Sequence, residues 1–308
     1  MDQLMQYSIY AAVMVFGYYT FTFVYRHFMR GPKQLITVYG STAIVTGATD
    51  GIGKSIAIEL ARRRLNLILI SRNSSKLNDT KSEINQLYPG VTIDTLSIDY
   101  SKFTTDDCNR LTELIRDKQI GVLVNNVGLS YSYPDYLHNL SSDEIINLLR
   151  INIDSTTLMT YTVLHRMIAQ QKGLIVNISS AASMMPAPLL SIYGAAKQYI
   201  DKLTDSLSIE YTSKYPNIQF QVHNPLYVAT KMAKMRPSIQ TPTSAQYARV
   251  AVNAFGYERH ISPYWVHALI LGVAKRLPNV LIEPYINSMH KSIRIRAQKK
   301  AANANKKQ

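Results

Sequence analysis

The sequence contains a single cysteine, Cys108, among its 308 residues. One thiol cannot form an intrachain disulfide, which fits a reducing compartment. The seven histidines form no His-Glu-x-x-His pattern and no Cys/His cluster, so the sequence predicts no metal site. The length and the 46% hydrophobic composition are sufficient for one α/β domain of about 250 residues with additional segments at its ends.

Acidic residues are absent from the last eighteen positions, 291–308, which carry Lys291, Arg294, Arg296, Lys299, Lys300, Lys306 and Lys307. Half of the formal net charge of +14 therefore lies in this tail. Such an uneven distribution indicates a tail that faces the cytosol or a membrane, not a basic recognition surface on a domain. No helix-turn-helix, zinc-finger or RNP pattern accompanies the charge, and we expect no nucleic-acid partner.

Charged residues are also absent from Tyr7 to Tyr25, a run of nineteen residues. A helix of this length spans roughly 28 Å, close to the hydrocarbon thickness of a bilayer, and tyrosines lie at both of its ends. Basic residues follow the run, whereas a signal peptide carries them before it. The sequence predicts a membrane anchor in residues 1–35 with the following domain in the cytosol. An apolar helix docked on the domain is the alternative.

From Gly40 onward, short apolar runs alternate with helical patterns. The expected strands are 42–45, 67–70, 91–98, 121–124, 174–178 and 218–223. The expected helices are 54–64, 74–87, 104–118, 142–170 and 193–215. Apolar strands that alternate with helices indicate a parallel sheet covered on both faces. We therefore predict an α/β, Rossmann-type doubly wound domain over residues 36–290, followed by the basic tail 291–308.

A glycine-rich turn, TGATDGIG at Thr46–Gly53, separates the first expected strand from the first expected helix. Glycines allow the backbone to turn tightly and to approach a pyrophosphate, which binds at a helix N-terminus. A plain tight turn also uses glycine, but the strand before and the helix after favour a dinucleotide site.

The residues after the second expected strand are Ser71-Arg72-Asn73. An acid at this place would bind the ribose hydroxyls of NAD, whereas a guanidinium would pair with a 2′-phosphate. Arg72 therefore favours NADP(H), with a solvated loop arginine as the alternative.

Tyr193 and Lys197 are four residues apart in SIYGAAK, which places them on one face of a helix. Four motifs occur in order along the chain: TGATDGIG, NNVG at 125–128, ISS at 178–180 and YGAAK at 193–197. Together they resemble the short-chain dehydrogenase/reductase family over about residues 40–264. The resemblance implies a catalytic set of Asn152, Ser180, Tyr193 and Lys197. It implies cofactor contacts from Gly47, Thr49, Asp50, Gly51, Ile52, Gly53, Ser71, Arg72, Asp99, Asn126, Tyr193, Lys197, Val228 and Thr230.

Within this resemblance Tyr193 is the proton donor for ketone reduction, and the Lys197 charge is expected to lower the pKa of its phenol from about 10. Ser180 lies thirteen residues before Tyr193 and would hold the substrate carbonyl, with the adjacent Ser179 as the alternative. Asn152 matches the asparagine that kinks a long helix and holds a water in a proton relay. Leu226 stands where the family usually has glycine, which we interpret as a reshaped cofactor loop.

A closer resemblance is to the membrane-bound very-long-chain 3-ketoacyl-CoA reductases, which overlap with 17β-hydroxysteroid dehydrogenases. It rests on NNVGLSYSYPDY, PLLSIYGAAK and PLYVATKM. It implies reduction of a lipid ketone at the endoplasmic reticulum membrane. The resemblance to the wider family implies a homodimer that pairs through helices that include 193–215. Segments 129–136 and 183–190 would flank the pocket, or they are ordinary surface loops. A steroid substrate and a non-catalytic scaffold are the rival hypotheses.

The region 262–285 is rich in apolar residues but is interrupted by Lys275 and Arg276. We expect a strand and a helix of the domain with one apolar face at the bilayer. A second membrane span is the alternative.

Overall fold

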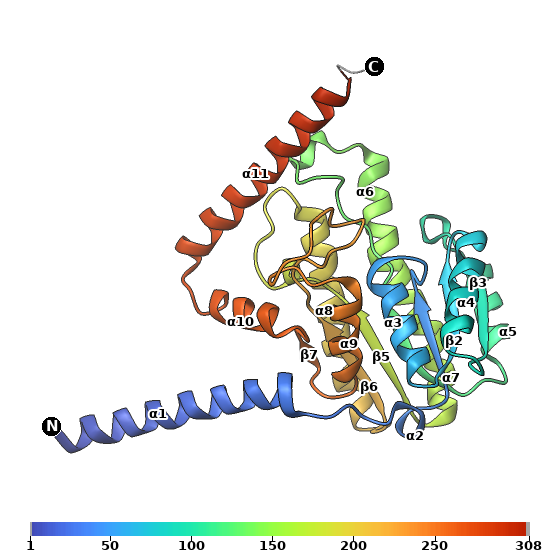
Figure 1. Cartoon of the computed structure of the whole chain (residues 1–308), viewed down its shortest axis with the longest axis horizontal. Coiled ribbons are helices and arrows are strands. Elements are labelled where there is room, and N and C mark those ends of the chain that lie inside the picture. Colours follow the sequence, from blue (N-terminus) through green and yellow to red (C-terminus); the bar gives the residue numbers. More distant parts are fainter. Residues whose placement is uncertain (1, 306–308) are drawn as a thin grey trace. The chain divides into compact units, whose positions relative to one another are not determined.

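The computed structural model of the chain describes residues 2–305 (Figure 1). The chain divides into two compact units, residues 1–32 and 33–308. The first unit is helix α1 (Asp2–Val24), which continues as the π-helical turn η1 (Tyr25–Met29). The segment Gln3–Met29 is long and apolar enough to cross a membrane, and it is the one such helix in the part of the chain described.

The second unit is built on a parallel sheet of seven strands in the order β3-β2-β1-β4-β5-β6-β7. Their bounds are β1 Thr42–Thr46, β2 Asn66–Ser71, β3 Ile93–Ser97, β4 Ile120–Asn125, β5 Gly173–Ile178, β6 Ile218–His223 and β7 His260–Ile261. The strand order reverses between β1 and β4, and ligands of such sheets bind outside the carboxyl ends of the strands at this point.

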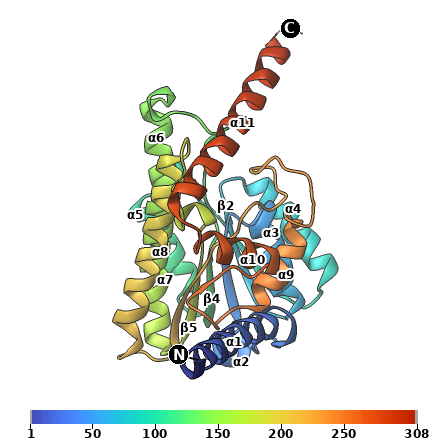
Figure 2. The ribbon, with the colours of Figure 1, turned by 90° about the vertical axis from the view of Figure 1, so that its left-hand side faces the viewer.

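Helices cover both faces of the sheet, as Figure 2 shows. Their bounds are α2 Leu35–Val38, α3 Gly51–Arg62, α4 Ser74–Leu87, α5 Thr105–Ile115, α6 Ser142–Leu149, α7 Ser155–Gln170, α8 Ser191–Thr212, α9 Ser244–Asn253, α10 Trp265–Ala274 and α11 Asn279–Asn305. Successive strand residues point to opposite faces, so Val45 packs in a core with α3, α4 and α9, while Ile44 packs in a second core with α5 and α7. This burial on both faces explains the continuous apolar runs and confirms the predicted α/β Rossmann-type fold.

Two of the differences from the expected bounds bear on the site. Helix α3 begins at Gly51 instead of residue 54, because the Asp50 carboxylate accepts a hydrogen bond from the Gly51 amide at 2.7 Å and starts the helix within the glycine turn. The expected helix 142–170 is divided into α6, the π-helical segment η4 (Arg150–Asp154) and α7. Each difference lies beside a predicted site residue.

The apolar region 262–285 forms α10 and the start of α11, and neither is a candidate span among the described residues. Exposed apolar side chains remain on it, including Leu269, Val273 and Leu281. Residues 291–305, which the sequence predicts as part of a basic tail, continue helix α11. Residues 306–308 of that tail lie outside the described part of the chain.

Candidate active site

The glycine turn follows β1 at the point where the strand order reverses. Gly47 and Gly51 have φ angles of 63° and 56°, a left-handed conformation that glycine adopts without steric cost. A Cβ at Gly53 would clash with the Gly47 carbonyl oxygen and the Asn126 side chain. The turn therefore requires glycine for its shape, and it leaves a bare backbone at the N-terminus of α3, as a pyrophosphate site needs.

Residues from neighbouring strand ends hold this turn in place. The Asn126 amide nitrogen donates to the Thr46 carbonyl at 3.0 Å, and the Asn126 backbone donates to the Thr46 hydroxyl at 2.9 Å. The hydroxyls of Thr49 and Ser71 lie 3.0 Å apart, which joins the turn to the end of β2. The structure thus brings these predicted cofactor residues together at one edge of the sheet.

The Thr230 methyl group approaches Gly51 so closely that a Cβ on that glycine would lie 3.2 Å from it. Val228 is buried two residues earlier, and the Thr230 hydroxyl accepts a hydrogen bond from the Ala233 amide at 3.2 Å. Both predicted contacts after β6 therefore lie on a loop that reaches the glycine turn. Ile52 lies partly buried against the core beneath the turn.

Arg72 and Asp99 follow β2 and β3, at the end of the site where an adenosine would lie. The Asp99 carboxylate accepts hydrogen bonds from the Ser101 hydroxyl and amide at 2.8 and 3.0 Å. These bonds, opposed by partial burial and assisted by the charge of Arg72, lower the pKa of Asp99. Arg72 is exposed, so its guanidinium is accessible to an anionic group of a ligand.

Tyr193 and Lys197 lie one turn apart on α8, and the Lys197 ammonium is 5.8 Å from the centroid of the Tyr193 ring. Lys197 is only 4% exposed, and its ammonium donates to the Ile178 carbonyl at 3.0 Å. Burial lowers the pKa of Lys197 to about 8, against the opposing charge of Asp201.

The pKa of the Tyr193 phenol differs from the sequence expectation. Burial raises it, a hydrogen bond with Ser180 lowers it, and the neighbouring Tyr227 raises it further, so that it lies above its ordinary value. The largest cause is burial, which disfavours the charged phenolate. Ser180 is thus the serine at the phenol, whereas the Ser179 hydroxyl donates to the Lys197 carbonyl at 3.1 Å.

Asn152 is fully buried within the π-helical segment η4. Its amide nitrogen donates to the Leu129 and Leu148 carbonyls, both at 2.8 Å, and its oxygen accepts from the Leu129 amide at 3.3 Å. A π-helical turn releases a backbone carbonyl from the regular ladder, and such turns occur often at functional sites. The π-helical segment interrupts the long helix at Asn152, and the Asn152 side chain ties it to the loop after β4.

Gly128 lies between two of the predicted catalytic residues. A Cβ at this position would be 3.1 Å from the Asn152 oxygen and 3.2 Å from the Lys197 ammonium. Asn152 and Lys197 therefore face a common space at the carboxyl end of β4. The arrangement can hold a carbonyl group at Ser180 and Tyr193 and place an amide and an ammonium behind the phenol.

A buried polar cluster that was not predicted from the sequence is formed at Asp201 of α8. The Ser183 hydroxyl donates to the Asp201 carboxylate at 2.6 Å, and the Asn224 amide donates to it at 2.9 Å. Asp201 is four residues beyond Lys197, on the face that carries Tyr193. The sequence carried one signal for this cluster: Tyr193, Lys197 and Asp201 follow each other at intervals of four residues, which places the Asp201 carboxylate on the same helix face.

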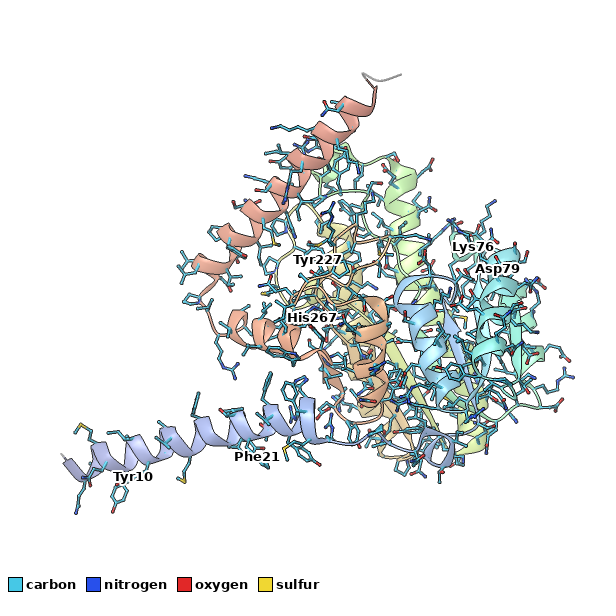
Figure 3. The ribbon with its side chains drawn as sticks, in the orientation of Figure 1. Tyr10, Phe21, Lys76, Asp79, Tyr227 and His267 are labelled. Atoms are coloured by element: carbon cyan, nitrogen blue, oxygen red, sulfur yellow. The ribbon has the colours of Figure 1, made fainter. Side chains whose placement is uncertain are left out.

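The cofactor loop at Leu226 is fixed by α10. The Leu226 amide donates to Nδ1 of His267 at 3.3 Å, and Nε2 of His267 donates to the Gln240 carbonyl at 3.0 Å. These bonds require a neutral ring with its hydrogen on Nε2, and burial accordingly lowers the pKa of His267. Figure 3 labels His267 and Tyr227 in this region. The loop that carries Leu226 is therefore tied to α10 and to Gln240.

The predicted substrate segment 183–190 borders a cavity of about 380 Å³, formed with the first turns of α8. Its lining includes Met184, Met185 and Pro186, together with Gly194 and Gln198. Its lining includes neither Tyr193 nor Lys197, so the cavity lies beside the predicted catalytic residues. Among the described residues, no group of three or more His, Cys, Asp or Glu side chains could hold a metal ion.

The family described as short chain dehydrogenase matches residues 41–240, and the chain belongs to the short-chain dehydrogenase/reductase family of NAD(P)-dependent enzymes. It is 38% identical to the very-long-chain 3-oxoacyl-CoA reductase of Homo sapiens over 264 residues, covering 85% of this chain and 83% of that protein. It is 40% identical to the hydroxysteroid dehydrogenase-like protein 1 of Gallus gallus over 253 residues, covering 80% and 75%.

Solved structures show the same fold. One from a study of 7beta-hydroxysteroid dehydrogenase stereoselectivity has a TM-score of 0.72 at 19% identity and covers 82% of this chain and 98% of its own. A short-chain dehydrogenase from Sphingobium yanoikuyae in complex with NADPH has a TM-score of 0.64 at 24% identity, covering 77% and 96%. The glycine cradle between β1 and α3 fits the dinucleotide that this family uses.

Proposed function

We propose that this chain is an NADPH-dependent reductase of long-chain 3-ketoacyl-CoA in fatty-acid elongation. The observation that carries the proposal is the joint presence of Asn152, Ser180, Tyr193 and Lys197 at one strand edge in a chain whose relatives include very-long-chain 3-oxoacyl-CoA reductases at 38–41% identity. A steroid ketone is the second candidate substrate, favoured by the 40% identity to the hydroxysteroid dehydrogenase-like relative.

When bound, NADPH would supply the hydride that reduces the carbonyl carbon of the substrate. The Ser180 hydroxyl orients the carbonyl oxygen, and the Tyr193 phenol donates its proton to that oxygen as negative charge develops. The raised pKa of Tyr193 keeps the phenol protonated at neutral pH. Lys197 lies one turn behind and stabilises the phenolate that remains, and Asn152 holds the loop after β4 through Leu129.

The preference for NADPH over NADH rests on Arg72. Its exposed guanidinium follows β2, and no acidic side chain occurs in Ser71-Arg72-Asn73 to bind ribose hydroxyls. A planar guanidinium can bind a 2′-phosphate through two parallel hydrogen bonds. The glycine turn and Asp99 supply contacts that both nucleotides share.

The proposed location is the endoplasmic reticulum membrane, with residues 33–308 in the cytosol. The apolar segment Gln3–Met29 would form the anchor, and the basic residues that follow it would remain on the cytosolic side. The acyl chain of such a substrate is apolar and partitions into the membrane. An enzyme anchored at the bilayer surface is therefore close to its substrate.

The experiment is an NADPH-oxidation assay of the purified full chain with a long-chain 3-ketoacyl-CoA and, in parallel, a 17-ketosteroid. Turnover of the acyl-CoA supports the first proposal. Turnover of the steroid alone would replace it with the second, and activity that persists in Tyr193→Phe would overturn the catalytic assignment.

A further inference from the structure

Helix α11 contacts both segments that flank the site, although it lies outside the family match at residues 41–240. Arg294 Nε donates to the Asp135 carboxylate at 2.7 Å, and the guanidinium lies 5.2 Å from the centroid of the Tyr136 ring. Four residues earlier on the same helix, His290 Nδ1 bonds the Pro188 carbonyl at 2.6 Å. Asp135 and Tyr136 are in segment 129–136, and Pro188 is in segment 183–190. Figure 1 shows α11 running beside the chain that leads into α6.

Asp135 is the shared hydrogen-bond acceptor in the contact between α11 and segment 129–136. A single carboxylate oxygen accepts from Arg294, from the Asn139 side chain and from the Tyr136 amide at 2.7 to 2.8 Å. Burial opposes the charge, but these hydrogen bonds outweigh it and lower the pKa of Asp135. The carboxylate is mostly buried, so loss of Arg294 would leave a charge that water reaches poorly.

The second contact holds a strained turn. Leu189 has a φ of 63°, a left-handed conformation that is unfavourable for a residue with a Cβ and persists only when neighbours enforce it. Two hydrogen bonds do so: His290 bonds the Pro188 carbonyl, and the Asp135 amide donates to the Leu189 carbonyl at 2.9 Å. Pro188 can only accept, so Nδ1 of His290 carries the hydrogen.

This turn leads directly into the catalytic helix. Leu189 is two residues before the start of α8, and Tyr193 lies in the first turn of that helix. Tyr131, in the other segment, accepts a hydrogen bond from the Ile192 amide at 3.2 Å. The same segment begins at Leu129, which Asn152 bonds. The contacts of α11 are therefore connected, through two short segments, to both ends of the proposed site.

We propose that His290 and Arg294 form a latch, here called the α11 latch, that positions the two substrate segments and the start of α8 for the lipid substrate. They are positioning residues, because they contact the segments and not the reacting groups. The inference rests on the proposed function for its substrate, but its structural part concerns only segments 129–136 and 183–190.

The test compares Arg294→Ala with Arg296→Ala in the full-length chain. Arg296 has the same charge on the same helix, is exposed, and donates to the Ser292 carbonyl of its own helix. We expect Arg294→Ala to raise KM for the long-chain 3-ketoacyl-CoA about tenfold, the scale of one hydrogen bond to a charged group, with a smaller change in kcat. The Kd of NADPH should stay unchanged, because His290 and Arg294 hold segments 129–136 and 183–190, whereas the nucleotide would bind at the glycine turn. Arg296→Ala should behave as wild type.

Amide hydrogen exchange provides a readout that needs no substrate. We expect faster exchange in segments 129–136 and 183–190 of Arg294→Ala and of His290→Ala, with β1 and β4 unchanged. Arg294→Ala combined with Asp135→Asn should lose less than the sum of the two single variants, since both remove one pair. Unaltered exchange together with an unaltered KM would overturn the latch. If the two variants exchange faster as expected but the wild type reduces no acyl-CoA, the proposed substrate is overturned and the latch stands.

Discussion

The Lys197 ammonium lies one helical turn behind the phenol of Tyr193, 5.8 Å from the ring centroid, and its hydrogen bond goes to the Ile178 carbonyl at 3.0 Å. The lysine is thus held at the end of β5 by the backbone, in a position that faces Asn152 across Gly128. The Lys197 ammonium, whose charge the proposed reaction would require, is buried away from water, and this burial lowers the pKa of Lys197.

The first prediction concerns stability as a function of pH. The pKa of Lys197 is lowered from 10.5 to about 8 in the folded protein, so the unfolded chain binds this proton more tightly. Stability should therefore rise with pH between about 8 and 10.5. Relative to Lys197→Met, the wild type should gain about 2 kcal/mol in free energy of unfolding from pH 8 to pH 10, measured by urea denaturation. A constant difference across this window would contradict the lowered pKa.

The second prediction concerns the proton donor. Tyr193→Phe removes the phenol hydroxyl and keeps the ring, so kcat for ketone reduction should fall roughly 100- to 10,000-fold while the fold is retained. Tyr199→Phe is the matched control, because this tyrosine is on the same helix and its hydroxyl bonds Thr157 away from the site. An equal loss in both variants would mean that the effect comes from α8 and not from proton donation.

The third prediction concerns nucleotide choice. Arg72→Ala should weaken NADPH binding roughly tenfold or more and leave NADH binding nearly unchanged, because only NADPH carries the 2′-phosphate. Fluorescence titration with each nucleotide measures this. Arg116→Ala, an exposed arginine paired with Glu113 on α5, should change neither affinity. Equal weakening of both nucleotides would remove the phosphate role from Arg72.

The fourth prediction concerns the glycine turn. Gly53→Ala would press a methyl group against the Gly47 carbonyl and the Asn126 side chain, so it should destabilise the protein by about 1–3 kcal/mol and abolish nucleotide binding. Gly272→Ala is the control, because its Cβ meets only the flexible Arg276 side chain at 3.7 Å and helix α10 should gain slightly from alanine. Normal nucleotide binding by Gly53→Ala would show that the cradle is not the dinucleotide site.

The fifth prediction concerns the membrane. The full chain should remain in the membrane pellet after alkaline carbonate extraction, because Gln3–Met29 would span the hydrocarbon region. Two arginines placed at Val13 and Val15, near the middle of this segment, should shift the chain to the supernatant, since charges there oppose insertion. Release of the unmodified chain by carbonate would contradict a membrane span.

Much of the fold could be predicted because its signals are local. The continuous apolar runs required strands buried on both faces, and helix α4 occupies Ser74–Leu87 as the pattern indicated. The glycine spacing after β1 and the Tyr193–Lys197 spacing are short-range features, and each lies in the predicted place at the end of a strand or the start of a helix. The start of α3 at Gly51 was missed because a side-chain cap from Asp50, not helix propensity, determines it.

The sequence by itself determined the Rossmann-type domain, the glycine turn and the residue types of the site, because backbone sterics and burial periodicity act over a few neighbouring residues. Only the tertiary structure decided which groups meet: Lys197 with the Ile178 carbonyl, Ser183 and Asn224 with Asp201, and Arg294 with Asp135. The last pair is separated by 159 positions along the chain. Contacts at such separations depend on how whole elements pack, and that packing leaves no periodic signal in the sequence.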